Sequence, residues 1–242
     1  KGGRTSAGTH MVSSHTASLA GAREVWEAMC KQTGAINTYS MDELLDMLVA
    51  FSRMPKATGY RVLVGGGAGG KSVTSADECE EEGLDVQPIP DDIRKELTSQ
   101  DPFFGPWVTN PVDSSIMGGS NLKPHEVIEF IAKSPNYDVV INTVSAGGPW
   151  GGHDPARQQR AARILEHTIG ISQNLGKPVA LVLSESIPES SEQYEVNLEL
   201  RHKCLGEGFA IFPSMSRASR AIGRLVRYYV WASEELKELG KP

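Results

Sequence analysis

RVLVGGGAGGKS (residues 61–72) is the stretch that decides the fold. It begins with the short apolar run RVLVG at 61–65, which is typical of a buried strand. A run of glycines follows, and then a helical pattern that ends near Gly83. A strand, a glycine-rich turn and a helix in this order are the beginning of a βαβ unit, so the stretch predicts an α/β protein with a parallel sheet.

The same alternation of strand and helix continues along the chain. Apolar runs predict further strands at 86–89, 138–144, 178–184 and 209–213. Helical spacing predicts helices at 91–97, 124–133, 156–175, 190–205 and 216–239. The segment 101–123 is rich in Pro, Gly and Ser and predicts a loop. Because the strands are apolar on both faces, we expect a flavodoxin-like, doubly wound parallel sheet of five strands.

Two helices are predicted before this sheet. Residues 23–33 carry apolar residues at helical spacing. Ser40 opens the second helix, since Ser40 and Glu43 have the spacing of a capping box. The apolar stripe of this second helix consists of Leu44, Leu45, Leu48 and Phe51. The small, polar residues before the first helix predict a mobile loop, so we divide the chain into a loop (1–22), a helical extension (23–58) and a flavodoxin-like domain (59–242).

Composition excludes several classes of protein. The chain has 242 residues and a net charge of −6, which argues against nucleic acid or an anionic membrane as the main partner. No run approaches the roughly 20 apolar residues of a membrane-spanning helix. The three cysteines form no CxxC pair, which fits a reducing cytoplasm. Since the chain begins at Lys1 and not at a Met, we expect it to be a piece of a longer polypeptide.

The turn at 65–72 is the sharpest local signal for a ligand. Its glycines let the backbone approach an anion, and the following helix directs free N–H groups at that anion. Gly65 to Ser72 also satisfies G-x-x-x-x-G-K-[ST], the P-loop pattern. Asp138 lies at the wrong end of its strand to hold Mg²⁺, which argues against a P-loop. Phosphate binding, a nucleotide P-loop and a purely structural turn all remain open on the residues alone. The candidate phosphate-binding residues are Gly66, Gly67, Ala68, Gly69, Gly70, Lys71 and Ser72.

His15 is a second candidate. It lies in SSHTASLAG, where small neighbours leave the ring room to enter a narrow site, and neutral imidazole is a good phosphoryl acceptor near pH 7. From the residues alone, a solvent-exposed histidine, or a helix cap formed by Ser14 or Thr16, is the favoured explanation of the segment, because a lone histidine is weak evidence for a site. The other histidines have no metal-type spacing, so we expect no metal site in this chain. These are His10, His125, His153, His167 and His202.

Four segments in register resemble the ADP-forming acyl-CoA synthetases, the acetate–CoA ligase relatives of succinyl-CoA synthetase. KGGRTSAGTHMVSSHTASLAG (1–21) resembles the stretch around the phosphorylated histidine of that family, with Ala17 and Ser18 in place of the usual Gly and Ala. GGAGGKSVTSADECEEEGL is similar to the family's glycine-rich turn, except that Lys71-Ser72 replaces the usual Pro-Gly. NPVD at 110–113 and the tail IFPSMSRASRAIGRLVRYY match in the same order.

The resemblance implies a phosphohistidine at His15, supported by Ser14 and Thr16 and docked at the 66–72 turn, with Asn110 and Asp113 as further candidates near the site. It makes residues 1–22 the phosphohistidine loop of a ligase that forms acyl-CoA from a carboxylic acid, CoA and ATP through an acyl phosphate.

The partners implied are CoA-binding and ATP-grasp domains, on the same chain or on a partner subunit of an oligomer. We expect no cofactor on this chain alone; CoA, ATP and Mg²⁺ serve the complete enzyme. Two alternatives stay open: a P-loop nucleotide-binding module that uses Gly65–Ser72, and a non-catalytic, synthetase-like regulatory region.

Overall fold

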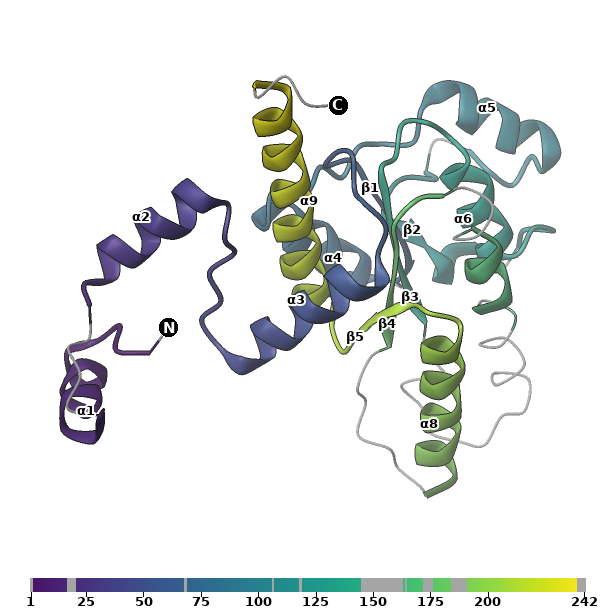
Figure 1. Cartoon of the computed structure of the whole chain (residues 1–242). Coiled ribbons are helices and arrows are strands. Elements are labelled where there is room, and N and C mark those ends of the chain that lie inside the picture. Colours follow the sequence, from purple (N-terminus) through teal and green to yellow (C-terminus); the bar gives the residue numbers. More distant parts are fainter. Residues whose placement is uncertain are drawn as a thin grey trace.

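The computed structural model describes residues 2–16, 21–67, 69–105, 107–117, 119–144, 163, 165–171, 176–183 and 191–238. Five parallel strands form one sheet in the order β2-β1-β3-β4-β5, as seen at the centre of Figure 1. The strands are β1 (Val62–Gly67), β2 (Val112–Asp113), β3 (Val139–Val144), β4 (Val179–Leu183) and β5 (Ala210–Phe212). This order and the helices on both sides of the sheet confirm the predicted flavodoxin-like α/β fold.

Eight labelled helices accompany the sheet in the described part of the chain. The N-terminal ones are α1 (Ser6–Thr16), α2 (Arg23–Thr33) and α3 (Met41–Arg53). The others are α4 (Gly70–Glu81), α5 (Asp91–Gln100), α6 (Pro124–Ala132), α8 (Ser191–Gly206) and α9 (Met215–Glu238). Of the helix predicted at 156–175, Arg163 and residues 165–171 are described, and they are helical. No described helix combines the length and apolarity needed to cross a bilayer.

Two hydrophobic cores flank the sheet because neighbouring residues of a strand point to opposite faces. Val62 and Val64 pack into the core under α3, α4 and α9, whereas Leu63 packs into the core under α5, α6 and α8. Strand β3 divides its residues in the same way. The β1–β3 pairing runs from Val62 opposite Val139 to Gly65 opposite Asn142, so the ends of both strands meet at one edge of the sheet.

The prediction for the second strand was wrong. Residues 86–89 form no strand; instead Arg61 and Asp85 form an isolated bridge, and the edge strand β2 lies within the segment predicted to be a loop. Pro88 and Pro90 have no N–H to donate to a ladder, which explains why this run cannot continue the pairing. Val112 is fully buried and pairs with Gly65.

The prediction of a loop over residues 1–22 was also wrong in part, because Ser6–Thr16 forms the helix α1. The Gly8 amide donates to the hydroxyl of Thr5 (3.1 Å), as at the N-terminus of a capped helix. Most of the described side chains of α1 are exposed, so this helix has no apolar stripe by which the sequence could have revealed it.

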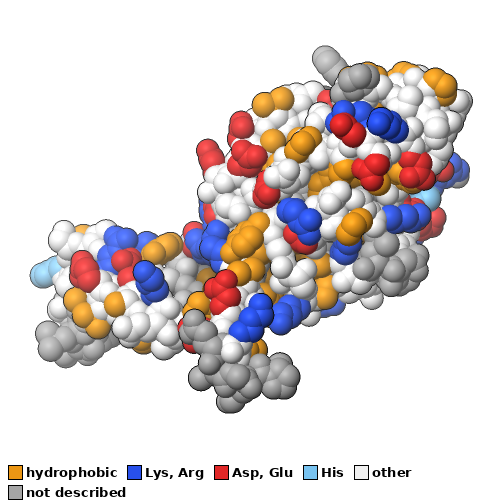
Figure 2. All heavy atoms as spheres, turned by 90° about the horizontal axis from the view of Figure 1, so that it is seen from above, with side chains coloured by type: hydrophobic (Ala, Val, Ile, Leu, Met, Phe, Trp, Pro, Cys, Tyr) orange, Lys and Arg blue, Asp and Glu red, His pale blue; other side chains and the backbone are white. Residues whose placement is uncertain are grey.

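Helix α3 begins where the sequence predicts. Ser40 is the N-cap, its hydroxyl accepts the Glu43 amide, and the Glu43 carboxylate accepts the Tyr39 amide. The buried face is not the predicted stripe, however. Met47 and Ala50 face α9, whereas Leu48 is 57% exposed. Figure 2 shows hydrophobic side chains at the surface where the N-terminal helices project from the main body.

Candidate functional site

The turn between β1 and α4 lies at the carboxyl edge of the sheet, where ligands bind in folds of this type. Two of its glycines have backbone conformations that other residues rarely adopt. Gly66 has φ +84°, and a Cβ there would lie 2.0 Å from the Thr143 carbonyl oxygen. Gly69 has φ +52° and precedes the first residue of α4. Both glycines therefore allow the chain to turn sharply from strand to helix. Ala68 lies outside the described residues.

The first turn of α4 offers amides to an anion. Gly70 and Lys71 occupy the first two positions of the helix, and within the described residues neither amide has an acceptor. The Lys71 side chain is exposed and forms no ion pair with any described residue. Ser72 is 8% exposed, and its hydroxyl has no hydrogen-bond partner in the described structure. Free amides, a lysine and an unpartnered hydroxyl together suit an oxyanion.

Ser72 faces back toward the strand. Its Oγ would lie 2.8 Å from a Cβ at Gly67, so the hydroxyl points into the turn and not toward solvent. An unsatisfied buried hydroxyl costs about 1–3 kcal/mol unless a ligand or water pairs with it.

Asp113 already occupies part of the positive end of α4. Its Oδ2 accepts the Gly69 amide at 2.8 Å, and its Oδ1 accepts both the amide and the hydroxyl of Ser115. Burial raises the pKa of the Asp113 carboxyl, but the hydrogen bonds from Ser115 and Gly69 outweigh it and hold the pKa below its usual range. The carboxylate shows that the turn accommodates a negatively charged oxygen.

The Asn110 side chain holds neighbouring backbone segments together. Its Oδ1 accepts the Val64 amide at 2.9 Å, and its Nδ2 donates to the carbonyls of Val62 (2.8 Å) and Gln87 (2.9 Å). The side chain is 7% exposed, and all these bonds go to the backbone. Its role in the described structure is to bridge β1 to the segment beside it, so Asn110 has no donor directed at the turn.

His15 lies in the last turn of α1 and is exposed. Its ring is therefore free to meet a partner surface, as a phosphoryl carrier requires. Ser14 donates its hydroxyl to the Met11 carbonyl at 3.0 Å, so this hydroxyl is engaged by the helix backbone. The side chain of Thr16 lies outside the described residues.

The structure does not bring His15 to the turn before α4. Figure 1 shows α1 at the far end of the N-terminal projection, away from the sheet and α4. Among the described residues, Asp113 is the one predicted candidate that contacts the turn from a different strand. If His15 carried a phosphoryl group, as the sequence predicts, that group would reach the α4 of this chain only after a large movement of α1, or would reach the α4 of another copy.

Two histidines that the sequence did not single out form a pair. The rings of His125 on α6 and His167 lie 4.1 Å apart, and His167 Nδ1 lies 3.0 Å from a carboxylate oxygen of Glu129. Burial, followed by the charge of His167, holds the pKa of His125 below its usual value. Spacing along the chain gave no signal for this contact. Among the described residues, no group of three or more His, Cys, Asp or Glu side chains is arranged to hold a metal ion.

The geometry argues against a nucleotide P-loop. Strand β1 extends through Gly67 and α4 begins at Gly70, so most of the glycine run is strand and the connection is too short to wrap around several phosphates. Asp138 precedes β3 and forms two hydrogen bonds with the guanidinium of Arg61, at 2.8 and 2.7 Å. The structure confirms the prediction that Asp138 lies at the start of its strand, which is the wrong end for holding Mg²⁺.

The fold is that of a flavodoxin-like α/β protein, and the first amides of α4 have no acceptor among the described residues. Comparison with known proteins agrees. Residues 1–51, which include His15, match the family described as the succinyl-CoA ligase like flavodoxin domain. The chain is 31% identical over 201 residues to the α-subunit of the ADP-forming acetate–CoA ligase II of Pyrococcus furiosus, covering 80% of this chain and 41% of the relative.

One further relative and one solved structure are similar to this chain. The ADP-forming 4-hydroxybutyrate–CoA ligase of Nitrosopumilus maritimus is 33% identical over 151 residues, covering 61% of this chain and 21% of the relative. The dinucleotide forming acetyl-coenzyme A synthetase 1 of Ca. Korarchaeum cryptofilum, solved in complex with phosphate and ADP, has the same fold with a TM-score of 0.71 at 22% identity, covering 98% of this chain and 47% of that one. The chain is thus a relative of the ADP-forming acyl-CoA ligases, as its motifs predicted. It spans less than half the length of each of these relatives.

Proposed function

We propose that this chain is the phosphoryl-carrying part of an ADP-forming acyl-CoA ligase, an acid–thiol ligase, with His15 as the carrier. The observation that supports this most directly is that the match to the succinyl-CoA ligase like domain covers the segment in which His15 is exposed. An exposed imidazole on a projecting helix is suited to carry a group between distant sites.

In this proposal the ligase exchanges acyl-CoA and phosphate for CoA and an acyl phosphate. The imidazole of His15 then attacks the phosphorus, the P–O bond to the acyl group breaks, and the carboxylate leaves. ADP takes the phosphoryl group from the imidazole in the last step, and the reverse sequence makes acyl-CoA from the acid, CoA and ATP. His15 is thus the nucleophile in one direction and the leaving group in the other.

The start of α4 would hold the phosphoryl oxygens. The amides of Gly70 and Lys71, the positive end of the helix and the Ser72 hydroxyl are the groups that stabilise such an anion. The Lys71 ammonium adds a charge where the family's usual Pro-Gly has none. Gly66, Gly67 and Gly69 shape the turn and let the anion approach the backbone.

The complete enzyme would need CoA, ATP and Mg²⁺, and we assign these to CoA-binding and ATP-grasp domains on the same chain or a partner subunit. The part of the chain that the structure describes has no group of three or more His, Cys, Asp or Glu side chains that could hold a metal ion. The other substrate is a small carboxylic acid. The three buried, unpaired cysteines favour the cytoplasm as the location of this protein.

Labelling tests the proposal. The assembled enzyme that contains this chain is incubated with [γ-³²P]ATP, and we expect acid-labile, base-stable label that is absent from His15→Ala. His10→Ala is the matched control, because His10 is exposed on the same helix and should leave the label intact. Label that persists in His15→Ala would contradict the proposal.

The alternatives predict other results. A P-loop module would bind Mg-ATP at Gly65–Ser72 without other domains, and titration of this chain with Mg-ATP detects that binding. A non-catalytic regulatory region would give no label in the unaltered enzyme.

A further inference from the structure

We propose that Glu43 is a positioning residue. Through two arginines of α9, it fixes the residues just before α1, the helix that carries His15, relative to α4. This inference rests on the proposed function, because it concerns how the residues before α1 are anchored while α1 moves His15 to the docking helix. It is carried by a continuous series of polar contacts between the segment before α1 and the end of α4.

The series begins beside α1. Arg4 donates a hydrogen bond from Nη2 to the Tyr39 carbonyl at 3.1 Å, and its guanidinium carbon lies 4.7 Å from the centre of the Tyr39 ring. The Tyr39 amide in turn donates to Oε2 of Glu43 at 2.8 Å. The backbone that leads into α1 is thereby tied to the first turn of α3.

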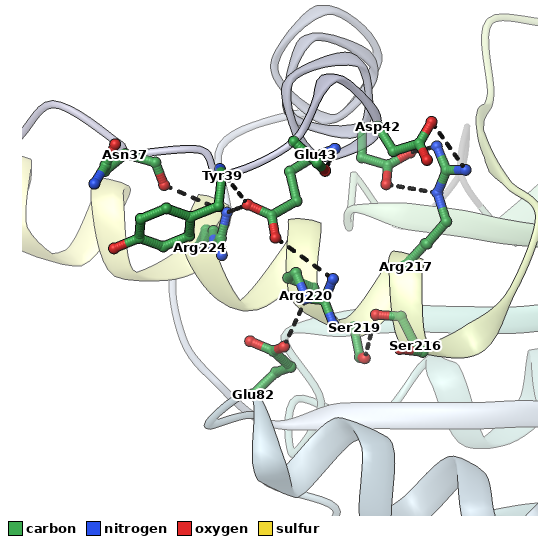
Figure 3. Close-up of polar contacts among 12 residues, drawn as sticks. Asn37, Tyr39, Asp42, Glu43, Glu82, Ser216, Arg217, Ser219, Arg220 and Arg224 are labelled. Atoms are coloured by element: carbon green, nitrogen blue, oxygen red, sulfur yellow. Dashed lines mark hydrogen bonds and ion pairs between the residues drawn. The ribbon is translucent and has the colours of Figure 1, made fainter. Parts of the chain in front are cut away.

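Glu43 is the junction of the series. Arg224 Nη1 donates to Oε2 at 3.0 Å, and Arg220 Nη1 lies 3.6 Å from Oε1. Figure 3 shows both arginines directed from α9 toward Glu43. The Glu43 and Arg224 side chains are 14% and 17% exposed, so water screens this pair little, whereas the Arg220 side chain is 37% exposed. Arg224 also donates to the Asn37 carbonyl at 3.5 Å, which adds a second bond to the segment before α3.

The series ends on α4. Arg220 Nε donates to the carboxylate of Glu82 at 3.0 Å, and Glu82 is the C-cap residue of α4. Arg227 donates to the Glu82 carbonyl at 2.6 Å. A Cβ at Gly223 would lie 2.5 Å from that same carbonyl oxygen, so α9 packs directly on this helix end. Since a helix is a stiff rod, holding one end of α4 also fixes the direction of its phosphate-binding start.

A neighbouring ion pair separates positioning from simple packing of α3 on α9. Asp46 of α3 accepts two hydrogen bonds from Arg217, both 2.8 Å long, and it is 8% exposed. This pair joins the same two helices, and Asp46 itself makes no described contact with Tyr39 or Glu82. Loss of Asp46 should therefore weaken the α3–α9 contact without disturbing the series that leads to α1.

The lifetime of the phosphohistidine reports the positioning. The assembled enzyme is labelled with [γ-³²P]ATP, free nucleotide is removed, and the loss of acid-labile label to water is followed in time. After α1 has moved, docking at α4 shields the phosphoryl group from water. Glu43→Gln loosens the anchor from which α1 moves, so it should shorten the lifetime by about tenfold, since small misplacements cost one to two orders of magnitude. Asp46→Asn should lower the melting temperature but leave the lifetime unchanged.

Arg4→Gln is a second variant, in an exposed side chain that does not threaten folding. It cuts the series on the histidine side and should also shorten the lifetime. The inference is overturned if Glu43→Gln, or Arg4→Gln where Glu43→Gln does not fold, keeps the lifetime of the unaltered enzyme. It is equally overturned if Asp46→Asn shortens the lifetime as much as they do. The proposed function fails separately, when the unaltered enzyme takes up no label at His15.

Discussion

The Gly69 amide and the Asp113 carboxylate are joined by a hydrogen bond of 2.8 Å across the start of α4. The bond connects the end of the edge strand β2 to the turn that we propose as the phosphate site. A negative group thus already stands where a phosphoryl oxygen would approach. The charge of Asp113 and the charge of the ligand must therefore oppose each other.

Removing this charge should strengthen anion binding. In Asp113→Asn the side chain still accepts a hydrogen bond, but the like-charge repulsion is gone. We expect the affinity for inorganic phosphate to rise about fivefold, equivalent to about 1 kcal/mol. Titration calorimetry with sodium phosphate measures this. Asp77→Asn, an exposed residue later on α4, is the control for net charge and should have little effect. Unchanged or weaker binding in Asp113→Asn would mean that phosphate does not approach this turn.

The Ser72 hydroxyl offers a second test of the same turn. Without ligand, Ser72→Ala should leave the free energy of unfolding unchanged or raise it by up to about 1 kcal/mol, because an unpartnered buried hydroxyl is removed. With phosphate present, the variant should gain less in melting temperature than the unaltered protein. Ser75→Ala, another buried serine of α4, should respond to phosphate normally. An equal response of Ser72→Ala and the unaltered protein would remove Ser72 from the site.

Asn110 should prove structural. Asn110→Ala leaves the Val64 amide and two carbonyls without their partner, so the free energy of unfolding should fall by about 2–4 kcal/mol. Urea unfolding measures the loss. The exposed Asn136→Ala should cost less than about 0.5 kcal/mol. A variant at Asn110 that keeps its stability and loses phosphate binding would instead assign this residue to the ligand.

The Arg61–Asp138 pair predicts a pH dependence of stability. Burial raises the pKa of Asp138, but the hydrogen bonds from the Arg61 side chain and amide outweigh it and hold the pKa below its usual value. The contribution is therefore complete above the pKa of about 4 that Asp has in the unfolded chain, and it is lost as the pH falls through the lower folded value.

Asp138→Asn should accordingly cost about 1–2 kcal/mol at pH 7, since Arg61 is partly exposed and the pair is partly screened. The difference should shrink toward zero in urea unfolding below the folded pKa. Asp91→Asn, whose surface pair is 84% exposed on the Asp side, should cost under about 0.5 kcal/mol at either pH. A loss at Asp138 that stays constant with pH would show that the charge is not what stabilises the fold.

The sequence by itself determined most elements and the fold class, because local physics marks them. Three apolar runs placed β3, β4 and β5, and the Ser40–Glu43 spacing placed the start of α3, since capping depends only on residues three apart. The glycine-rich run also placed the turn before α4. Four motifs in order predicted the family.

Only the tertiary structure decided what depends on residues far apart in the chain. The edge strand is Val112–Asp113 and not 86–89. Two residues are too few to show a strand pattern in the sequence, and this strand is defined by its pairing with Gly65 and Gly67. The fold brings Asp113 into contact with Gly69, and His125 into contact with His167. It also pairs Glu43 with two arginines of α9 that lie more than a hundred residues away in the chain. The buried face of α3 was set by its contacts with α9 and not by its leucines. Periodicity records which residues are apolar, but the partner that buries or pairs them is chosen when distant segments pack together.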